Sequence, residues 1–310
     1  MALAEDIVVK LEPRLGRHYA RQRLRIEDEH EARSTGTARS FRLENWHRAI
    51  RTTLRVTGLY RRALRNAERV QLRRTRIRLA DLPAIFNGFT LLHISDLHVD
   101  MNAGALRRAI ELITGLSYDI CVLTGDYRAA TYGPFHNTLA GMERLCAAIE
   151  RPIYGVLGNH DSLRMVPGME AMGIRVLLNE GEIIERAGRR IHLAGIDDAH
   201  FYRVDNIEKA LSQVRPGGCS ILLSHTPEIY RQAAHAGVGL MLSGHTHGGQ
   251  LCLPGAVPVT LQAVLPRHMG AGLWRYRDML GYTSVGLGSG IVPARLNCPP
   301  EIALHRLERG

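Results

Sequence analysis

The chain has 310 residues, 45% of them hydrophobic, so it is long enough to bury the core of one large domain and carry an extension. Its five cysteines form no Cys-x-x-Cys pair, which argues against a disulfide framework and favours free thiols in a reducing compartment. No apolar run reaches the roughly 18 residues of a transmembrane helix, and the acidic N-terminus lacks a signal-peptide core. We therefore expect a cytoplasmic protein, unless a surface segment holds it to the inner face of the membrane.

Positive charge is concentrated near the N-terminus. The first 80 residues contain 20 Lys and Arg against 9 Asp and Glu, whereas the rest of the chain contains 20 against 21. The formal net charge of +10 therefore belongs to the first quarter of the chain. This asymmetry predicts a basic extension joined to a near-neutral domain, with an anionic partner for the extension.

Residues 1–68 form the predicted basic extension. Its first part, residues 1–43, is polar and rich in arginine, and we expect partial disorder there. Residues 44–68 fit an amphipathic helix, with Trp46 and Leu54 on the apolar side and arginines on the other. Two interpretations stay open for this helix. Either it binds an anionic membrane surface, or its apolar face docks on the main domain while its arginines face solvent.

Residues 69–310 form the predicted main domain. From Arg69 to Leu79, apolar and basic residues alternate, which predicts an edge strand with its charges outward. Beyond it, unbroken apolar strands alternate with helices, which predicts an α/β fold whose sheets are covered on their faces. The expected strands are 89–94, 120–123, 153–156, 191–194, 220–223 and 240–242. The expected helices lie near 103–114, 137–150, 206–214 and 228–235.

Polar motifs follow five of these strands. They are Asp96-Leu97-His98, Gly125-Asp126, Gly158-Asn159-His160-Asp161, Ser224-His225 and Gly244-His245-Thr246-His247. Because functional groups in α/β folds gather at the carboxyl ends of strands, we expect the motifs to meet in space. Each motif alone fits a polar turn, but five of them in order at strand ends indicate a shared site.

The motifs together supply seven oxygen and nitrogen donors and no sulfur: Asp96, His98, Asp126, Asn159, His225, His245 and His247. This number exceeds the four ligands of a tetrahedral zinc and suits two ions that share one carboxylate. Mixed carboxylate, amide and imidazole ligation favours manganese, iron or zinc over copper(I). Two ions roughly 3.5–4 Å apart would activate a bridging water as hydroxide and neutralise phosphoryl charge. We therefore predict two divalent ions, manganese foremost, with iron, zinc or magnesium as alternatives.

The ordered motif set resembles that of the calcineurin-like metallophosphoesterases, over about residues 75–305. The resemblance implies a calcineurin-like αββα fold, a two-sheet sandwich flanked by helices. It implies one ion held by Asp96, His98 and His247, a second held by Asn159, His225 and His245, and Asp126 as the bridge. It also implies that His160 is the general acid facing the leaving group, and that Asp161 orients its imidazole.

Within this family, Gly248-Gly249-Gln250 and the segment from Gly286 to Arg295 resemble the small bacterial phosphoesterases. Some of these hydrolyse lipid-linked phosphodiesters or the pyrophosphate of UDP-2,3-diacylglucosamine. The resemblance therefore implies a phosphodiester or pyrophosphate hydrolase with a lipid-linked or membrane-associated substrate. Ala129 departs from the family pattern, because many relatives carry an acid there that supports the metal site. The neighbouring Arg128 would contact a substrate phosphate or face solvent.

Two other functions stay open. The arginines of the extension could follow nucleic-acid phosphates, as in a nuclease. However, the sequence has no recognisable base-stacking module, and basic residues mixed with apolar ones suit a bilayer surface. A non-catalytic scaffold would have lost ligands, whereas here every ligand position and His160 are intact. After the fourth strand, Asp197, Asp198 and His200 would line the substrate cleft or form a polar loop.

Overall fold

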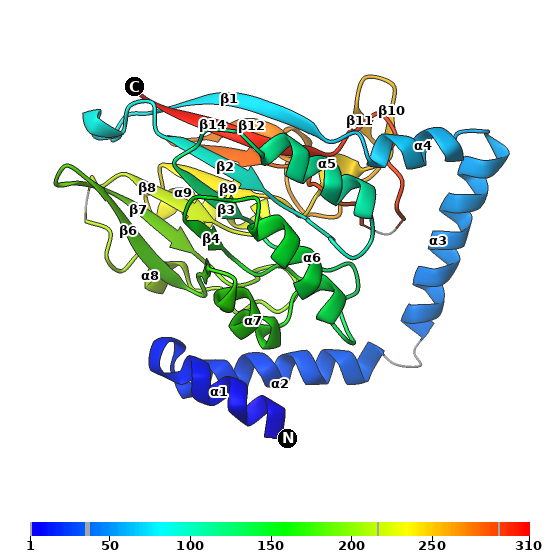
Figure 1. The fold of residues 1–310 in the computed structure, drawn as a ribbon, viewed down its shortest axis with the longest axis horizontal. Helices are drawn as coiled ribbons and strands as arrows, with labels where there is room; N and C mark the ends of the chain where they lie inside the picture. The colour runs from blue at the N-terminus through cyan, green and yellow to red at the C-terminus, as the bar shows by residue number, and fades with distance from the viewer. Residues whose placement is uncertain (1, 35–37, 216, 291) are drawn as a thin grey trace.

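Two six-stranded sheets pack face to face, with helices on their outer faces (Figure 1). This computed structural model describes residues 2–34, 38–215, 217–290 and 292–310, without the side chains of 2–4, 38–44 and 46. In spatial order, the first sheet holds β1 (Gln71–Leu79), β14 (Glu301–Arg309), β2 (Thr90–Ile94), β3 (Ile120–Leu123), β4 (Ile153–Gly155) and β5 (Ile174–Val176). The second holds β12 (Gly272–Tyr276), β13 (Met279–Thr283), β9 (Leu240–Ser243), β8 (Ser220–Leu223), β7 (Arg189–Gly195) and β6 (Glu180–Arg186).

Helices cover both outer faces, which confirms the predicted sandwich flanked by helices. Over the first sheet lie α1 (Ala2–Leu15), α2 (Arg17–Ser34), α5 (Ala103–Ile113), α6 (His136–Cys146) and α7 (Val166–Ala171). Over the second lie α8 (Ile207–Ala210) and α9 (Tyr230–His235). Along one side, α3 (Ala38–Val56) connects α2 to α4 (Tyr60–Ala67) (Figure 1). The short elements are the hairpin β10 (Cys252–Leu253) and β11 (Val257–Pro258), and the 3-10 helices η1 (Ala84–Phe86), η2 (Leu163–Met165), η3 (Pro227–Ile229), η4 (His247–Gly249) and η5 (Arg267–Met269).

The central strands are apolar throughout because both of their faces are buried. On β2, Leu91 faces the second sheet and belongs to the core between the sheets. The next residue, Leu92, points to the opposite face and packs in the core beneath the helices of the first sheet. Burial of each such side chain stabilises the fold by about 1.5–3 kcal/mol. The unbroken apolar runs in the sequence therefore indicate burial on two faces.

Parallel strands gather the predicted motifs at one end of the sandwich. In the first sheet β2, β3 and β4 are parallel neighbours, and in the second sheet β7, β8, β9 and β13 are. Their carboxyl ends lie together, so the loops that follow them are brought into one place. This arrangement positions the candidate site.

The predicted edge strand is confirmed, but its partner was not predicted. β1 lies at the edge of the first sheet and pairs with β14 in parallel along its whole length. The arginines of β1 are exposed. The four expected helices all occur, although the helix expected over 206–214 spans only Ile207–Ala210.

The expectation of partial disorder over residues 1–43 was wrong for the described part of that segment. Residues 2–15 and 17–34 form α1 and α2. Ile7, Leu11 and Leu15 recur every four residues, so they share one face of α1 and join the core cluster beneath the first sheet. The segment is polar overall, but its apolar residues recur at helical spacing, and this spacing allows it to form ordered helices.

The helix expected over 44–68 is interrupted. α3 ends at Val56, Gly58 adopts a φ of +70° that favours glycine, and α4 begins at Tyr60. The buried side chains of Leu54 and Ala63 pack against residues 292–294 of the main domain, while the side chain of Trp46 lies outside the described residues. Among the described helices, none is both long and apolar enough to cross a membrane.

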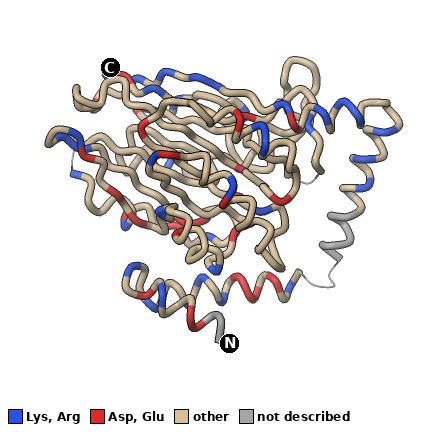
Figure 2. Tube along the Cα trace, viewed as in Figure 1, with Lys and Arg blue, Asp and Glu red and all other residues tan. Residues whose placement is uncertain are grey.

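Charge is distributed differently along the extension. Figure 2 shows acidic and basic residues interleaved on α2, whereas α3, α4 and β1 carry mainly Lys and Arg. Most of the basic excess predicted for the extension thus lies on its second half and on the edge strand.

Candidate metal centre

Two groups of buried side chains lie next to each other at the carboxyl ends of the strands. One ligand atom from each of Asp96, His98 and His247 lies within 4.8 Å of the others, and the same holds for Asp126, His225 and His245. We call these the first and the second ligand group. They come from the loops after β2, β3, β8 and β9, as the motif order predicts.

Asp126 lies between the two groups. Its Oδ2 is 3.3 Å from His225 Nε2 and 3.9 Å from His98 Nε2. His98 Nε2 in turn lies 3.3 Å from His247 Nε2. Asn159 adds its Oδ1 at 3.0 Å from His225 Nε2. The structure therefore brings all seven predicted donors into one site, with Asp126 placed to serve both groups.

Backbone carbonyls orient three of the imidazoles. His98 Nδ1 lies 2.7 Å from the carbonyl of Arg128, and His225 Nδ1 lies 2.8 Å from that of Thr124. An Nδ1–H donated to these carbonyls leaves the Nε2 lone pair facing the site. His245 is turned the other way, with Nε2 at 2.9 Å from the carbonyl of Gln262 and Nδ1 facing His225. Each ring therefore directs one lone pair inward.

Burial keeps most of these imidazoles neutral. It lowers the pKa of His98 to about 4 and that of His245 to about 3, and it takes the pKa of His247 well below its ordinary value. Burial also acts to lower the pKa of His225, but the carboxylates of Asp126 and Asp96 outweigh it and raise that pKa to about 10. Among these four imidazoles, His225 is thus the one that is cationic near neutral pH when no metal is bound.

The two carboxylates differ in pKa. Burial would raise the pKa of Asp126, but the imidazoles of His225 and His160 hold it well below its usual range. Burial raises the pKa of Asp96 to about 6. Near neutral pH the cluster therefore combines ionised carboxylates, an amide oxygen and mostly neutral imidazoles. This donor set fits divalent cations such as manganese, iron or zinc.

Five of the seven donors lie on left-handed backbone. The φ values are 47° at Asp96, 39° at His98, 56° at Asp126, 69° at His245 and 49° at His247. A non-glycine residue in this region costs about 1–3 kcal/mol, and such residues cluster at functional sites. The surrounding sheets hold these loops in the strained conformation, so the ligand positions are formed by the fold itself.

Two motif glycines allow the donors to approach closely. A Cβ atom at Gly244 would lie 1.8 Å from the Oγ of Ser95. A Cβ at Gly158 would lie 2.3 Å from Asp126 Oδ1. Glycine is therefore required at both positions by the packing of the ligand loops.

His160 lies at the open edge of the cluster. Its side chain is 28% exposed, whereas those of His98 and His225 are fully buried. Its Nε2 is 3.9 Å from Asp126 Oδ2, and its Nδ1 is 3.2 Å from the hydroxyl of Thr131. This exposure and position suit a group that meets substrate better than one that is enclosed around an ion.

Asp161 does not take the position expected of it. Its carboxylate accepts hydrogen bonds from the backbone N–H groups of Asp126 at 2.7 Å, Tyr127 at 2.9 Å and Gly158 at 2.8 Å. These bonds tie together the loops after β3 and β4. The expected orientation of the His160 imidazole by Asp161 is therefore corrected, because the ring Nδ1 contacts the Thr131 hydroxyl and the ring packs against His98.

Arg128 also differs from the sequence-based interpretations. Arg128 is buried and donates to the backbone carbonyls of Thr131, Gly133 and His160, so it neither faces solvent nor points to a substrate. It fixes the loop that carries the Thr131 hydroxyl. The N–H of Ala129 donates to Asp100 at 2.9 Å.

Sequence reasoning assigned no role to Arg295, which lies behind His247. Its buried guanidinium donates to the carbonyls of Val285 at 2.7 Å and Gly288 at 2.9 Å, and it lies 3.3 Å from His247 Nδ1. The Arg295 N–H donates to the carbonyl of Ala63 in α4. A lone arginine in a glycine-rich tail was the only signal available.

His200 extends the site, whereas Asp197 and Asp198 are enclosed. The His200 ring centroid lies 4.3 Å from that of His245, and its Nδ1 lies 2.6 Å from Glu228 Oε2. Asp198 accepts hydrogen bonds from the N–H groups of Phe201 and Tyr202 within its own loop.

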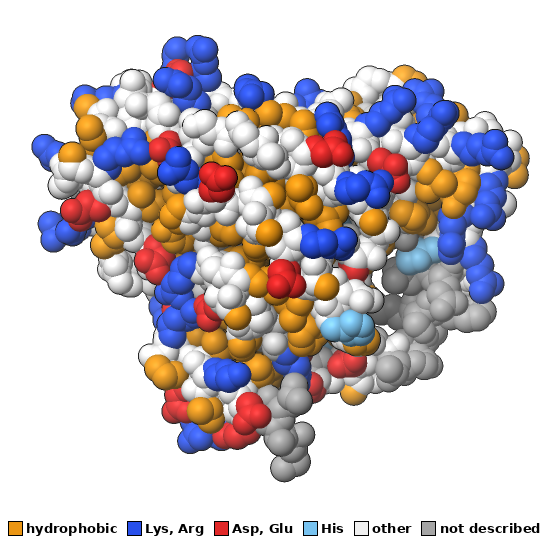
Figure 3. All heavy atoms as spheres, viewed as in Figure 1, with side chains coloured by type: hydrophobic (Ala, Val, Ile, Leu, Met, Phe, Trp, Pro, Cys, Tyr) orange, Lys and Arg blue, Asp and Glu red, His pale blue; other side chains and the backbone are white. Residues whose placement is uncertain are grey.

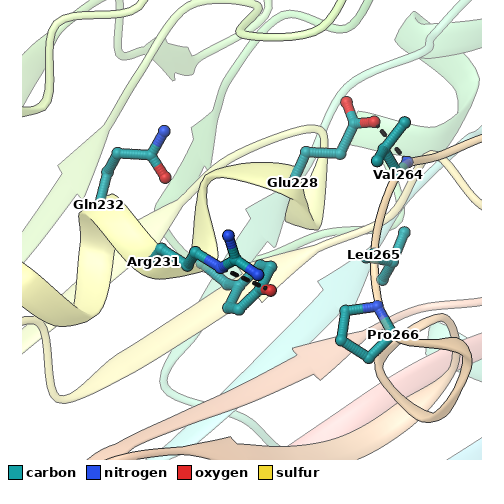
Figure 4. Close-up of a pocket in the computed structure, with 7 residues that line it drawn as sticks. Glu228, Arg231, Gln232, Val264, Leu265 and Pro266 are labelled. Atoms are coloured by element: carbon teal, nitrogen blue, oxygen red, sulfur yellow. Dashed lines mark hydrogen bonds between the residues drawn. The ribbon is translucent and has the colours of Figure 1, made fainter.

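Beyond Glu228 lies a cavity of about 450 Å³. In Figure 4, Arg231 and Gln232 lie on one side of it and Val264, Leu265 and Pro266 on the other. Glu228 lines this cavity and contacts His200, which in turn lies against His245 of the second ligand group.

Comparisons with known proteins agree with this geometry. The family model of the calcineurin-like phosphoesterases matches residues 89–249. The uncharacterized metallophosphoesterase YkoQ of Bacillus subtilis (strain 168) is 31% identical over 81% of this chain and 95% of its own length. The phosphodiesterase YaeI of Escherichia coli (strain K12) is 28% identical over 71% of this chain and 82% of its own. A transmembrane protein with metallophosphoesterase domain from Danio rerio is 31% identical over 71% of this chain and 53% of its own length.

The matched region contains the loops that carry all seven donors and His160. The strand order, the two ligand groups and the match to YkoQ agree on one assignment. The chain belongs to the calcineurin-like phosphoesterase family and is a metal-dependent phosphoester hydrolase.

Proposed function

We propose that this enzyme hydrolyses a phosphodiester or pyrophosphate bond of a lipid-linked substrate, with UDP-2,3-diacylglucosamine hydrolysis as one candidate reaction. The observation that carries the proposal is the pair of ligand groups joined at Asp126, with the partly exposed His160 at their edge. A site of this kind holds a phosphoryl group on one side and leaves a proton donor on the other.

Each group would hold one divalent ion in this proposal. Asp96, His98 and His247 would hold the first ion, Asn159, His225 and His245 would hold the second, and Asp126 lies between the two groups. Such ions supply a water of lowered pKa and balance the negative charge of the phosphoryl oxygens. Manganese is the metal we assign first, with iron, zinc and magnesium as alternatives, because the donors are oxygen and imidazole nitrogen.

His160 acts as the general acid in this reaction. Its ring is held at Nδ1 by the Thr131 hydroxyl, and its Nε2 faces the cluster beside Asp126. A protonated Nε2 placed there donates to the oxygen of the leaving group as the P–O bond breaks. Asp161 supports the reaction by fixing the loop that carries His160.

An apolar surface beside the site supports a membrane-associated substrate. Leu253, Val257 and Val259 of the β10–β11 hairpin and the loop after it are 57%, 48% and 64% exposed. Leu251, at the base of that hairpin, packs against the α3–α4 region. Exposed apolar side chains next to basic helices are typical of a surface that binds anionic lipid.

The basic helices border this hairpin. Arg51, Arg55 and Arg62 are exposed on α3 and α4, and Figure 3 shows Lys and Arg side chains gathered over α4 and the adjoining part of α3. We assign the cavity next to Glu228 to the remainder of the substrate. Its lining combines Arg231 with apolar side chains, which suits a molecule with both polar and apolar parts.

Hydrolysis of bis(p-nitrophenyl) phosphate with Mn²⁺ tests the reaction. We expect turnover by the purified protein and loss of at least a thousandfold in kcat for Asp126→Ala, because one carboxylate serves both groups. A full complement of metal with no turnover of any phosphoester would contradict the proposal. Absence of bound metal, with unchanged folding of His245→Ala, would favour a scaffold.

Binding at matched ionic strength tests the membrane surface. We expect the protein to sediment with vesicles containing anionic phospholipid and to remain in solution with zwitterionic vesicles. Equal or stronger binding to single- or double-stranded DNA would instead favour a nuclease, in which the arginines follow nucleic-acid phosphates.

A further inference from the structure

Helix α2 buries an ion pair against the loop that carries Asn159 and His160. Arg23 and Glu27, four residues apart, are 0% and 5% exposed, and their side chains pair at 2.7 Å. Charged side chains are rarely buried to this extent without a specific set of partners. The contacts of this pair therefore indicate what the helix does.

Glu27 binds the segment that directly follows Asp161. Its carboxylate accepts hydrogen bonds from the N–H of Leu163 at 2.7 Å, from the hydroxyl of Ser162, and from Arg164 Nη1 at 2.9 Å. Leu163 begins η2, so Glu27 satisfies a backbone donor at the start of that turn. The polar groups of this segment are held by a helix more than a hundred residues away in sequence.

Arg23 joins two loops of the site. Its Nε donates to Asp197 Oδ2 at 3.0 Å, and its Nη2 donates to the carbonyl of Asp161 at 3.4 Å. The guanidinium carbon lies 3.5 Å from the ring centroid of Tyr202. Burial alone would lower the pKa of Arg23, but the carboxylates of Asp197 and Glu27 raise it above its ordinary value, so the residue is always charged.

These contacts act on the ligand loop from behind. The carboxylate of Asp161 is bonded to the backbone of Gly158 and Asp126, and its carbonyl is bonded to Arg23. Asn159 and His160 lie between Gly158 and Asp161. A segment fixed at both ends gives its intervening side chains little freedom, so the position of α2 sets the positions of Asn159 Oδ1 and the His160 ring.

We infer that Arg23 and Glu27 are positioning residues of the metal centre, which place the loop Gly158–Leu163 so that Asn159 completes the second ligand group and His160 faces the leaving group. We call the contacts of Arg23 and Glu27 with this loop the clamp. Both residues lie outside residues 89–249, so the clamp belongs to the extension of this chain and not to the region that the family model matches. The inference rests on the proposed metal centre. Its consequence is that the extension is part of the catalytic machinery.

Titration of the chelator-treated full-length protein with Mn²⁺ tests this inference without relying on activity. For Glu27→Ala we expect one of two binding steps to weaken by about tenfold, the range seen when supporting partners of metal ligands are removed, while the other step is unchanged. We also expect kcat for bis(p-nitrophenyl) phosphate to fall at least tenfold, with KM changed less than threefold.

Two further variants separate positioning from loss of stability. Glu27→Gln keeps an acceptor for the Leu163 N–H, so at the weakened step it should bind Mn²⁺ at least threefold more tightly than Glu27→Ala does. Glu29→Ala removes an exposed acid two positions away on the same helix and should bind both ions as the wild type does. A folded Glu27→Ala protein with wild-type affinity for both ions and wild-type kcat would overturn the inference.

Ser162→Ala keeps the test decisive if Glu27→Ala does not fold. It removes one donor to Glu27 and the acceptor of the Arg164 N–H but keeps the Arg23–Glu27 ion pair, and we expect about threefold weaker binding at the same step. Wild-type Mn²⁺ affinity in this variant would overturn the inference. A wild-type protein that binds Mn²⁺ at two sites but cleaves no phosphoester would contradict the proposed function. The Mn²⁺ affinities of the variants would then still decide whether Arg23 and Glu27 position the metal ligands.

Discussion

The two halves of the N-terminal extension use their charges in opposite ways. On α2, Arg23 and Glu27 are buried and their charges are bonded to loops of the metal centre. On α3 and α4, Arg51, Arg55 and Arg62 are exposed. Both halves are rich in arginine, but α2 also carries acidic residues, whereas α3 and α4 carry mainly basic ones.

The difference lies in the apolar residues that accompany the charges. In α1, Ile7, Leu11 and Leu15 form a continuous face that joins the main core, and this face holds α2 close enough for its charges to be desolvated. In the described part of the second half, a smaller apolar cluster around Leu54 and Ala63 packs against Val292 and Ala294 of the domain. Net charge therefore says little about the partner of a basic segment, whereas the extent of its apolar face decides whether its charges serve the fold or a surface.

Deletion of residues 2–34, which removes α1 and α2, is expected to have the largest effect on stability. The deletion exposes the core that Ile7, Val8, Leu11, Leu15 and Leu24 now cover. At about 1.5–3 kcal/mol for each buried side chain, the loss is comparable to the whole stability of a typical domain. We expect aggregation or a melting temperature lower by more than about 10 °C in differential scanning fluorimetry. An unchanged melting temperature with full activity would show that α1 and α2 are dispensable.

Arg23→Met and Arg25→Met compare a buried arginine with an exposed one on the same helix, α2. Arg23→Met leaves the carboxylates of Asp197 and Glu27 buried with one cation fewer, so we expect the free energy of unfolding to fall by about 3–5 kcal/mol. Arg25→Met on the same helix removes an arginine whose side chain is 80% exposed, and it should cost less than about 0.5 kcal/mol. Urea unfolding followed by circular dichroism measures both. Equal losses would show that burial of Arg23 is not what matters.

Replacement of Arg51, Arg55 and Arg62 by glutamine tests the second half. Each arginine near an anionic surface contributes about 1 kcal/mol, so we expect binding to anionic vesicles to weaken roughly a hundredfold. The unfolding free energy should stay within about 0.5 kcal/mol of the wild type, because all three side chains are exposed. Arg25→Gln with Arg33→Gln on α2 is the matched control and should leave vesicle binding nearly unchanged.

The pH dependence of metal uptake compares the first and the second ligand group. The pKa of His225 is raised to about 10, so a metal entering the second group displaces a proton, and its affinity should rise about tenfold per pH unit between about pH 7 and 9. In the first group the pKa of Asp96 is about 6 and that of His98 about 4. Affinity there should be constant above about pH 7 and fall below about pH 6. Calorimetric titration in buffers of different ionisation enthalpy measures the protons released, and release of none at pH 8 would contradict the assignment.

Local patterns in the sequence predicted the α/β architecture and the place where the polar motifs meet, and the family resemblance implied the two-sheet sandwich. Unbroken apolar strands with polar residues at their ends place those residues at one end of a parallel sheet. The role of Asp161 was not predictable in this way, because its partners are backbone groups of another loop. Nor was the clamp from α2, since Arg23 and Asp197 are 174 positions apart.

The register of the first sheet has a consequence for the order in which the protein folds. β14 lies between β1 and β2 and pairs with both, in parallel with β1 and antiparallel with β2. β1 therefore has no partner in the sheet until residues 301–309 have been synthesised, more than 200 residues later. Such long-range pairing folds slowly. A chain released before residue 301 would keep its apolar strands exposed.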